Sequence, residues 1–106
     1  MVEEVSPDWL KERLDGGAEV QVIDTRMTAE YAAGHIPGAE NVPYGELADR
    51  IADIDWGEEI VLVCQEGRSS RQAARILESY EGIDDDALVG NLAGGYDEWE
   101  YDLEVA

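Results

Sequence analysis

Short segments along the chain predict the strands of a buried sheet. Apolar residues predominate at 20–23, 60–63 and 87–92, and residues 39–42 are expected to form a further short strand. The run at 60–63 is continuous and mostly β-branched, which is typical of a strand covered on both faces. We therefore expect it to be the central strand of the sheet.

The segments between these runs carry the spacing and the end signals of helices. Ser6 followed by Pro7 is typical of a helix N-terminus, and the glycines at 16 and 17 end that helix. Thr28 is expected to cap a second helix through Ala33. The remaining helices are predicted over residues 44–54, from Ser69 or Ser70 to about Tyr80, and after Gly94 and Gly95 in a short terminal segment that carries Trp99.

Short buried strands that alternate with helices predict an α/β fold with a mainly parallel sheet. The sequence shows no internal repeat and no linker, so residues 1–106 are expected to form one domain. In sheets of this kind, functional sites form where strands end and helices begin.

The amino-acid composition indicates which classes of protein the chain can belong to. Apolar residues make up 44% of the chain, which is enough for a core. No apolar run approaches the 18 or so residues of a membrane span, and residues 1–5 lack the basic and apolar regions of a signal peptide. The single cysteine cannot form an internal disulfide. We therefore expect a cytoplasmic protein that does not bind membranes.

The net charge of -19 is extreme for a chain of this length. Such a chain repels nucleic acid and anionic membranes, so neither is an expected partner. The acids are spread along the sequence, a pattern suited to high salt, where self-repulsion is screened. We interpret this as the surface of a halophilic protein; the alternative is an ordinary acidic protein with a basic partner.

Cys64 stands where the expected central strand ends and the next helix is about to begin. The intervening loop contains no proline, so its backbone N–H groups are free to point inward, and Gly67 permits a tight turn. Converging N–H groups beside a helix N-terminus bind anions and stabilise a thiolate. A persulfide is also an anion and suits the same donors. We favour a reactive cysteine over the alternative, an inert buried one.

Basic residues gather around Cys64 although the chain as a whole is acidic. Residues 64–77 hold three arginines and one acid, Glu66. Arg68 lies inside the loop, where a positive charge favours an anionic sulfur donor. For Arg75, one helical turn beyond Arg71, solvation of a helix face is the simpler interpretation.

Four motifs, in order, resemble those of single-domain rhodaneses from about Val5 to Trp99. The segment VIDTR at 22–26 resembles the family's strand that ends in Asp-x-Arg. Glu30-Tyr31 with GHIPGA at 34–39 resembles its first signature, and CQEGRS at 64–69 resembles its six-residue active-site loop. LAGG at 92–95 with Trp99 resembles its second signature.

The resemblance implies a fold and a set of roles. It implies a rhodanese-like, five-stranded, mainly parallel sheet with helices on both faces and a core at about 5–99. Cys64 is the implied persulfide carrier, with Asp24, Arg26 and Arg71 in support. The implied substrate-binding residues are Gln65, Glu66, Gly67, Arg68, Ser69 and Ser70.

Several residues near these motifs also have simpler explanations. Asp24 and Arg26 are equally well explained as a structural salt bridge. His35 lies in a turn, which favours bonding to backbone over a dyad with Cys64. One Cys and one His are too few to suggest a metal site, and residues 84–86 are expected to form a solvated turn. Trp9, Trp56 and Trp99 are expected to pack in the core.

The expected activity is transfer of sulfur from a donor such as thiosulfate to a thiophilic acceptor, with no cofactor. The alternatives are a persulfide relay between proteins, or an interaction module, in a thiolation pathway. Acidic Glu66 weakens the case for a small anionic donor. A phosphatase or arsenate reductase is less favoured, because its loop is one residue longer and needs Arg where this chain has Ser70.

Overall fold

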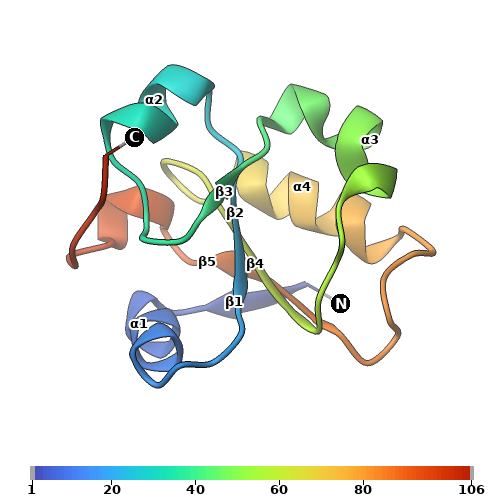
Figure 1. The fold of residues 1–106 in the computed structure, drawn as a ribbon, viewed down its shortest axis with the longest axis horizontal. Coiled ribbons are helices and arrows are strands. Elements are labelled where there is room, and N and C mark those ends of the chain that lie inside the picture. Colours follow the sequence, from blue (N-terminus) through green and yellow to red (C-terminus); the bar gives the residue numbers. More distant parts are fainter. Residues whose placement is uncertain (1, 106) are drawn as a thin grey trace.

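The computed structural model describes residues 2–105 and is built around five strands that all run parallel (Figure 1). Their spatial order is β1-β5-β4-β2-β3, so β4 lies in the middle, as predicted for the apolar run at 60–63. The strands are β1 (Glu3–Val5), β2 (Gln21–Asp24), β3 (Glu40–Asn41), β4 (Glu59–Val63) and β5 (Leu88–Leu92).

Helical segments connect the strands at the expected places. The α-helices are α1 (Pro7–Asp15), α2 (Thr28–Ala33), α3 (Leu47–Arg50) and α4 (Ser69–Glu78), and the 3-10 helices are η1 (Tyr44–Glu46), η2 (Ile51–Asp53) and η3 (Gly95–Glu98). The Ser6 hydroxyl accepts a hydrogen bond of 3.0 Å from the backbone of Trp9, which confirms the predicted cap of α1.

Three details of the helix predictions were wrong. Thr28 is the first residue of α2 and the cap is Met27, whose N–H is satisfied by the Glu30 carboxylate instead. The predicted helix at 44–54 is divided into η1, α3 and η2, with only four residues in true α-helical form. Trp99 follows η3 in extended conformation and packs in the core.

Alternating strand residues supply two cores, one on each face of the sheet. Val22, Val61 and Val63 face α1, the turn at 34–39 and η3, with Leu10 and Trp99 among their neighbours. The intervening residues face α3 and α4 and pack in a cluster of Ile23, Ile60, Leu62, Leu47, Ala73 and Leu77. The fold is therefore α/β with helical cover on both faces, and Figure 1 shows α1 and α4 on opposite sides of the strands.

The first strand was not predicted from the apolar pattern. β1 contains Glu3 and Glu4 and only one buried residue, Val5. Its pairing with β5 completes the five strands that the resemblance implied.

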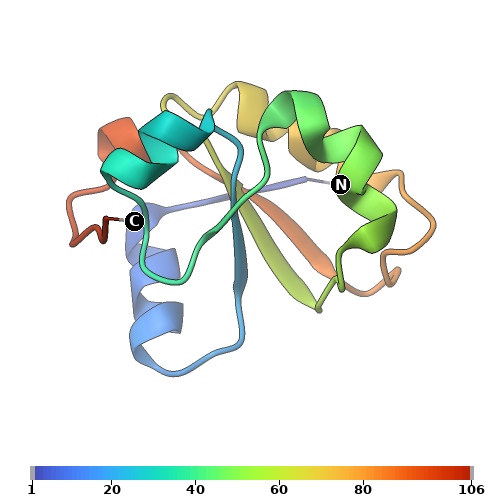
Figure 2. The same ribbon diagram turned by 45° about the horizontal axis from the view of Figure 1, so that its top comes forward.

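Because the strands are parallel, their carboxyl ends meet at one edge of the sheet. Asp24 of β2 is in register with Val63 of β4, and Cys64 follows directly. Figure 2 shows the yellow loop after β4 at the top of the view, at the same end of the sheet as η3. The fold thus gathers the ends of β2, β4 and β5 around one cysteine.

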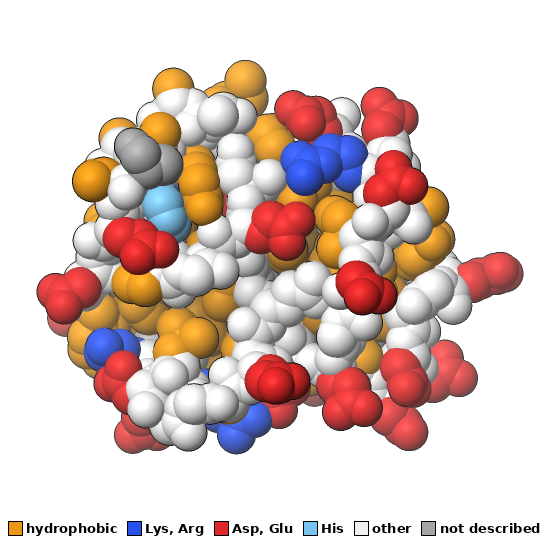
Figure 3. Space-filling model, viewed as in Figure 1, with side chains coloured by type: hydrophobic (Ala, Val, Ile, Leu, Met, Phe, Trp, Pro, Cys, Tyr) orange, Lys and Arg blue, Asp and Glu red, His pale blue; other side chains and the backbone are white. Residues whose placement is uncertain are grey.

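Acidic side chains are spread over the face of the molecule in Figure 3, with few basic ones among them. Within residues 2–105, no helix has the length and apolar character needed to cross a bilayer.

Candidate functional site

Cys64 lies at the bottom of a loop whose hydrogen-bond donors converge on its sulfur. The Sγ atom is 3.1 Å from the Gly67 backbone N, 3.4 Å from the Ser70 backbone N and 3.2 Å from the Ser70 hydroxyl. Only 5% of the residue is exposed. The sulfur is therefore held by backbone N–H groups, as the proline-free loop predicted.

The turn depends on a glycine in left-handed conformation. Gly67 has a φ of 87°, as its place in the loop suggested. A Cβ there would lie only 3.1 Å from the backbone N of Gly94. A Cβ on Gly95 would lie 2.2 Å from the Cys64 carbonyl oxygen. Gly94 and Gly95 therefore let the backbone before η3 lie directly against the cysteine loop.

Two backbone hydrogen bonds fasten the loop to η3. Tyr96 N–H donates to the carbonyl of Cys64 and Asp97 N–H donates to the carbonyl of Gln65, each at 3.0 Å. The Gln65 side chain adds a third bond, from its amide to Asp97 at 2.8 Å. The residues after β5 thereby fix the backbone that carries the sulfur.

Burial and hydrogen bonding act on the Cys64 thiol in opposite directions. Burial raises its pKa because it penalises the charged form. Hydrogen bonds to the sulfur from the Ser69 and Ser70 side chains and from the Ser70 and Gly67 backbone outweigh burial, and the pKa of Cys64 is lowered. The site thus stabilises a thiolate without a paired base.

Asp24 and Arg26 form a buried ion pair with an Nη2–Oδ2 distance of 2.8 Å. Arg26 also donates to the carbonyl of Gly34 at 2.6 Å, and Tyr96 donates its hydroxyl to Asp24 at 2.8 Å. Burial lowers the pKa of Arg26, but bonding to Asp24 outweighs it and the pKa is raised. The pair joins the turn at 34–39 to η3, and through Tyr96 to Cys64. Asp24 and Arg26 therefore form a structural salt bridge and are also linked, through Tyr96, to the loop that carries Cys64.

The predicted substrate-binding residues divide into inner and outer groups. Gly67 and Ser70 are buried and contact the sulfur directly. Gln65, Glu66, Arg68 and Ser69 are exposed. Within residues 2–105 the Arg68 side chain forms no hydrogen bond or ion pair, so its charge is available at the loop surface.

Arg71, expected to support the site, pairs with Glu4 of β1 at 3.0 Å. Its hydrogen bond with Glu4 raises the pKa of Arg71, and the charge of Cys64 adds to that effect. Arg71 therefore joins α4 to the first strand, near enough to Cys64 for the Arg71 pKa to respond to the charge of that residue.

Asn91 is a site residue that the sequence reading missed. It is fully buried in β5, where it contacts Gly67, Ser70 and Glu4. The available signal was an amide inside an otherwise apolar run at 87–92, because a buried polar group requires partners. Tyr96 and Glu4 were missed too, since their roles depend on contacts between distant segments.

His35 occupies a turn and bonds backbone, as expected. Its Nδ1 lies 2.9 Å from the Tyr31 carbonyl, and its ring stacks on Tyr31 with centroids 3.8 Å apart. Backbone bonds in both directions and a 3.5 Å side-chain contact join it to Glu104. Among the described residues, no hydrogen bond links His35 to Cys64.

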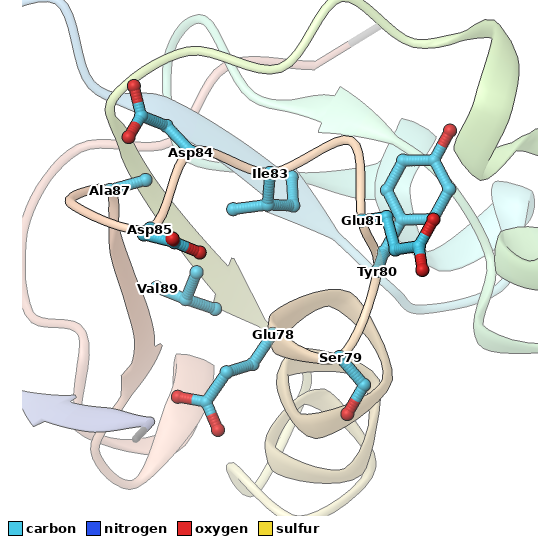
Figure 4. Close-up of a pocket in the computed structure, with 9 residues that line it drawn as sticks. All are labelled: Glu78, Ser79, Tyr80, Glu81, Ile83, Asp84, Asp85, Ala87 and Val89. Carbon is cyan, nitrogen blue, oxygen red and sulfur yellow. The ribbon is translucent and has the colours of Figure 1, made fainter.

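A hollow lies between the end of α4 and the start of β5, at the end of the sheet opposite Cys64. Figure 4 shows it rimmed by the carboxylates of Glu78, Glu81, Asp84 and Asp85. Within residues 2–105, no three His, Cys, Asp or Glu residues are arranged to hold a metal ion. The Asp84 carboxylate accepts from the Asp86 N–H, which makes residues 84–86 the predicted turn.

The chain is similar in sequence to several known proteins. The chain is 34% identical to the thiosulfate sulfurtransferase GlpE of Pseudomonas aeruginosa over 95 residues, or 90% of this chain and 81% of that protein. It is 31% identical to YrkF of Bacillus subtilis over 98 residues, but spans only 51% of that protein. It is 40% identical to the HTH-type transcriptional regulator Rv0324 of Mycobacterium tuberculosis over 85 residues, and spans 36% of it.

The fold has close counterparts among solved structures. A rhodanese-like domain protein from Staphylococcus aureus superposes with a TM-score of 0.83 over 99% of both chains, at 28% identity. Residues 6–102 match the family described as the rhodanese-like domain. On its sequence, its fold and its cysteine loop, this chain belongs to the rhodanese-like domain family.

Proposed function

We propose that the chain is a sulfurtransferase that carries a sulfur atom as a persulfide on Cys64. The observation that carries the proposal is the convergence of the Gly67 and Ser70 N–H groups on the sulfur, at 3.1 and 3.4 Å. These donors stabilise an anion without supplying a proton acceptor, which suits a thiolate and a persulfide equally.

In the first half-reaction the Cys64 thiolate attacks the outer sulfur of thiosulfate. The new bond joins Sγ to that sulfur, the sulfur–sulfur bond of thiosulfate breaks, and its electron pair leaves with sulfite. The product is a persulfide anion on Cys64. The loop donors then hold the negative charge, and exposed Arg68 attracts the dianionic donor.

In the second half-reaction a thiophilic acceptor attacks the outer sulfur of the persulfide. The Sγ–sulfur bond breaks and its electrons return to Cys64, which leaves as the thiolate that began the cycle. A lowered pKa of Cys64 assists here, because a stable thiolate is a better leaving group.

Thiosulfate is the donor we favour, and the support is the likeness to a thiosulfate sulfurtransferase over nine-tenths of this chain. A protein persulfide is the alternative donor, with a sulfur-acceptor protein as partner. Glu66 favours that alternative, since it places an acid on the exposed side of the loop. In either case the carrier is the same sulfur.

Phosphoryl chemistry fits this loop poorly. α4 begins at Ser69, and Ser70 is buried against Sγ, where a phosphatase of the longer-loop type needs an arginine. A tetrahedral oxyanion therefore lacks its expected cation. We expect no meaningful hydrolysis of aryl phosphates.

Mass spectrometry of the intact protein tests the proposal. The chain has one cysteine, so a gain of one sulfur atom after incubation with donor reports on Cys64 alone. Thiosulfate and a persulfidated protein are supplied separately, and a thiol reductant should remove the added mass. Cys64→Ser should neither load nor transfer sulfur. Transfer that persists in this variant would overturn the proposed role.

A further inference from the structure

The side chain of Asn91 has only one orientation that satisfies its neighbours. Its Nδ2 lies 3.0 Å from the Gly67 carbonyl oxygen and 3.1 Å from the Oε1 of Glu4. Both neighbours are acceptors, so both hydrogens of Nδ2 point to them. The amide oxygen of Asn91 is therefore left to face the Ser70 hydroxyl.

The Ser70 hydroxyl consequently has two acceptors and one hydrogen. Its Oγ lies 2.5 Å from the Oδ1 of Asn91 and 3.2 Å from the Sγ of Cys64. A hydroxyl can donate only one hydrogen bond. All three side chains are buried, so water is poorly placed to supply a second donor.

The consequence differs between the thiol and the anion. When Cys64 is a thiol, its S–H can donate to Ser70, whose own hydrogen serves Asn91, and every group is satisfied. When Cys64 is a thiolate or a persulfide it has become an acceptor on the side of Ser70. The hydroxyl must then serve either the sulfur or the amide oxygen.

We propose that Asn91 is a positioning residue that competes with the Cys64 sulfur for the Ser70 hydrogen. By drawing that hydrogen toward its own oxygen, it weakens the bond that the Ser70 hydroxyl gives the sulfur, leaves the anion mainly to the Gly67 and Ser70 N–H groups and to Ser69, and keeps the sulfur more nucleophilic. A thiolate that is held more weakly attacks faster, because nucleophilicity rises with the pKa of the thiol. Asn91 also fixes the Gly67 carbonyl while the Gly67 N–H faces the sulfur.

The inference deepens the proposed sulfurtransferase function, but its test needs no sulfur transfer. The rate of Cys64 alkylation by iodoacetamide, measured against pH, gives the pKa of the thiol and the reactivity of the full thiolate. If the protein fails to load sulfur, the proposed function fails and the alkylation result still decides the role of Asn91.

The decisive comparison removes Ser70 in two backgrounds. Asn91→Leu is nearly isosteric and takes away the competing acceptor, so it should lower the pKa of Cys64 and slow alkylation of the full thiolate. Ser70→Ala should raise the pKa only slightly in the wild-type background, where Asn91 holds the hydrogen. In the Asn91→Leu background the same change should raise the pKa of Cys64 more. At a pH below both pKa values, the thiolate fraction should then fall about tenfold.

Glu4→Gln is the matched control. It changes the charge at the other end of the Asn91 amide but leaves an acceptor for Nδ2, so Oδ1 still faces Ser70. The charged groups acting on this arrangement are Glu4 of β1 and Arg71 and Arg75 of α4, and none of them changes in the Ser70 and Asn91 series. We expect Glu4→Gln to leave the small effect of Ser70→Ala as it is in the wild type.

Equal effects of Ser70→Ala in both backgrounds would show that Asn91 does not compete, and would overturn the proposal. A raised pKa of Cys64 in a folded Asn91→Leu variant would also overturn the proposal. If Asn91→Leu does not fold, Asn91→Ala replaces it. If neither folds, the single variant decides: a large rise in the pKa of Cys64 in Ser70→Ala contradicts the proposal, and a slight one supports it.

Discussion

Tyr96 binds the backbone of Cys64 from one side and the side chain of Asp24 from the other. Its N–H donates to the Cys64 carbonyl at 3.0 Å, and its hydroxyl donates to the Asp24 carboxylate at 2.8 Å. The ring lies 3.8 Å from the Arg26 guanidinium, a distance at which a cation attracts an aromatic face. One residue of η3 thus couples the buried ion pair to the reactive loop.

Tyr96→Phe should destabilise the fold by about 1–3 kcal/mol. The change removes a donor from a fully buried carboxylate and an acceptor from the Ile36 N–H. Thermal or urea unfolding measures the loss. Tyr101→Phe is the matched control, because that hydroxyl also bonds a carboxylate, Asp8, but at the surface. It should change stability by no more than about 0.5 kcal/mol, and equal losses in both variants would contradict this assignment.

Gly67→Ala should cost more stability than Gly38→Ala. Both glycines have positive φ, 87° and 84°, so both variants carry backbone strain of about 1–3 kcal/mol. Only Gly67 adds a close approach, to the Gly94 N at 3.1 Å, because a Cβ at Gly38 meets nothing within 4 Å. Only Gly67→Ala should also raise the pKa of Cys64, by moving an N–H from the sulfur. If the two variants lose the same stability, the close approach of position 67 to the Gly94 N is not a cause of the loss.

The stability of the protein should depend on pH through Cys64. Its folded-state pKa lies below the ordinary value of 9.0, so the folded state favours the thiolate more than the unfolded state does. This contribution is fully present above about pH 9 and is lost as the pH falls through the lowered pKa. The free energy of unfolding of the wild type, minus that of Cys64→Ala, should therefore rise with pH up to that point. If this difference in free energy of unfolding falls as the pH rises toward 9, the pKa of Cys64 is not lowered in the folded state.

Arg68→Ala should weaken the use of thiosulfate without weakening the fold. The side chain is exposed, and within the described residues it forms no ion pair, so the melting temperature should scarcely change. The KM for thiosulfate should rise several-fold, because the dianion loses a nearby cation. Arg75→Ala removes the same charge from the exposed side of α4 and should raise KM less. A stability loss with normal kinetics would assign Arg68 a structural role.

Catalytic efficiency with thiosulfate should increase with salt. At about 0.01 M ionic strength the Debye length is about 30 Å, so the net charge of -19 repels the dianion before it reaches the loop. At about 1 M it is about 3 Å, and the donor senses little beyond the loop. Steady-state kinetics with circular dichroism measured in parallel separates this effect from refolding. A neutral donor should respond much less, and an equal response would assign the salt effect to stability.

Local sequence was sufficient to predict the parts of the site that lie within one segment. The apolar run before Cys64, the absence of proline after it and Gly67 together predicted a strand, a donor-rich turn and a helix. The resemblance to the family's motifs also indicated that Asp24 and Arg26 support the cysteine loop. The halophilic source and the identity of the donor remain predictions.

What could not be predicted depends on contacts between distant segments. Asn91 gains its partners only when β5 lies between β1 and β4, since Glu4 is 87 residues away in the chain. β1 itself has no apolar alternation, because an edge strand with one buried residue needs none. The helix at 44–54 had the correct apolar face, but helical periodicity alone does not distinguish α from 3-10 turns.

The two outermost strands have a consequence for solubility. β1 has three residues and β3 has two, and each carries exposed carboxylates, Glu3 and Glu4 on one and Glu40 on the other. Unpaired backbone on a longer apolar edge would offer a template for a strand from another molecule. Edges this short, and negative on both sides of the sheet, repel their own copies. The same acids that complicate the approach of an anionic donor thereby protect the sheet from aggregation.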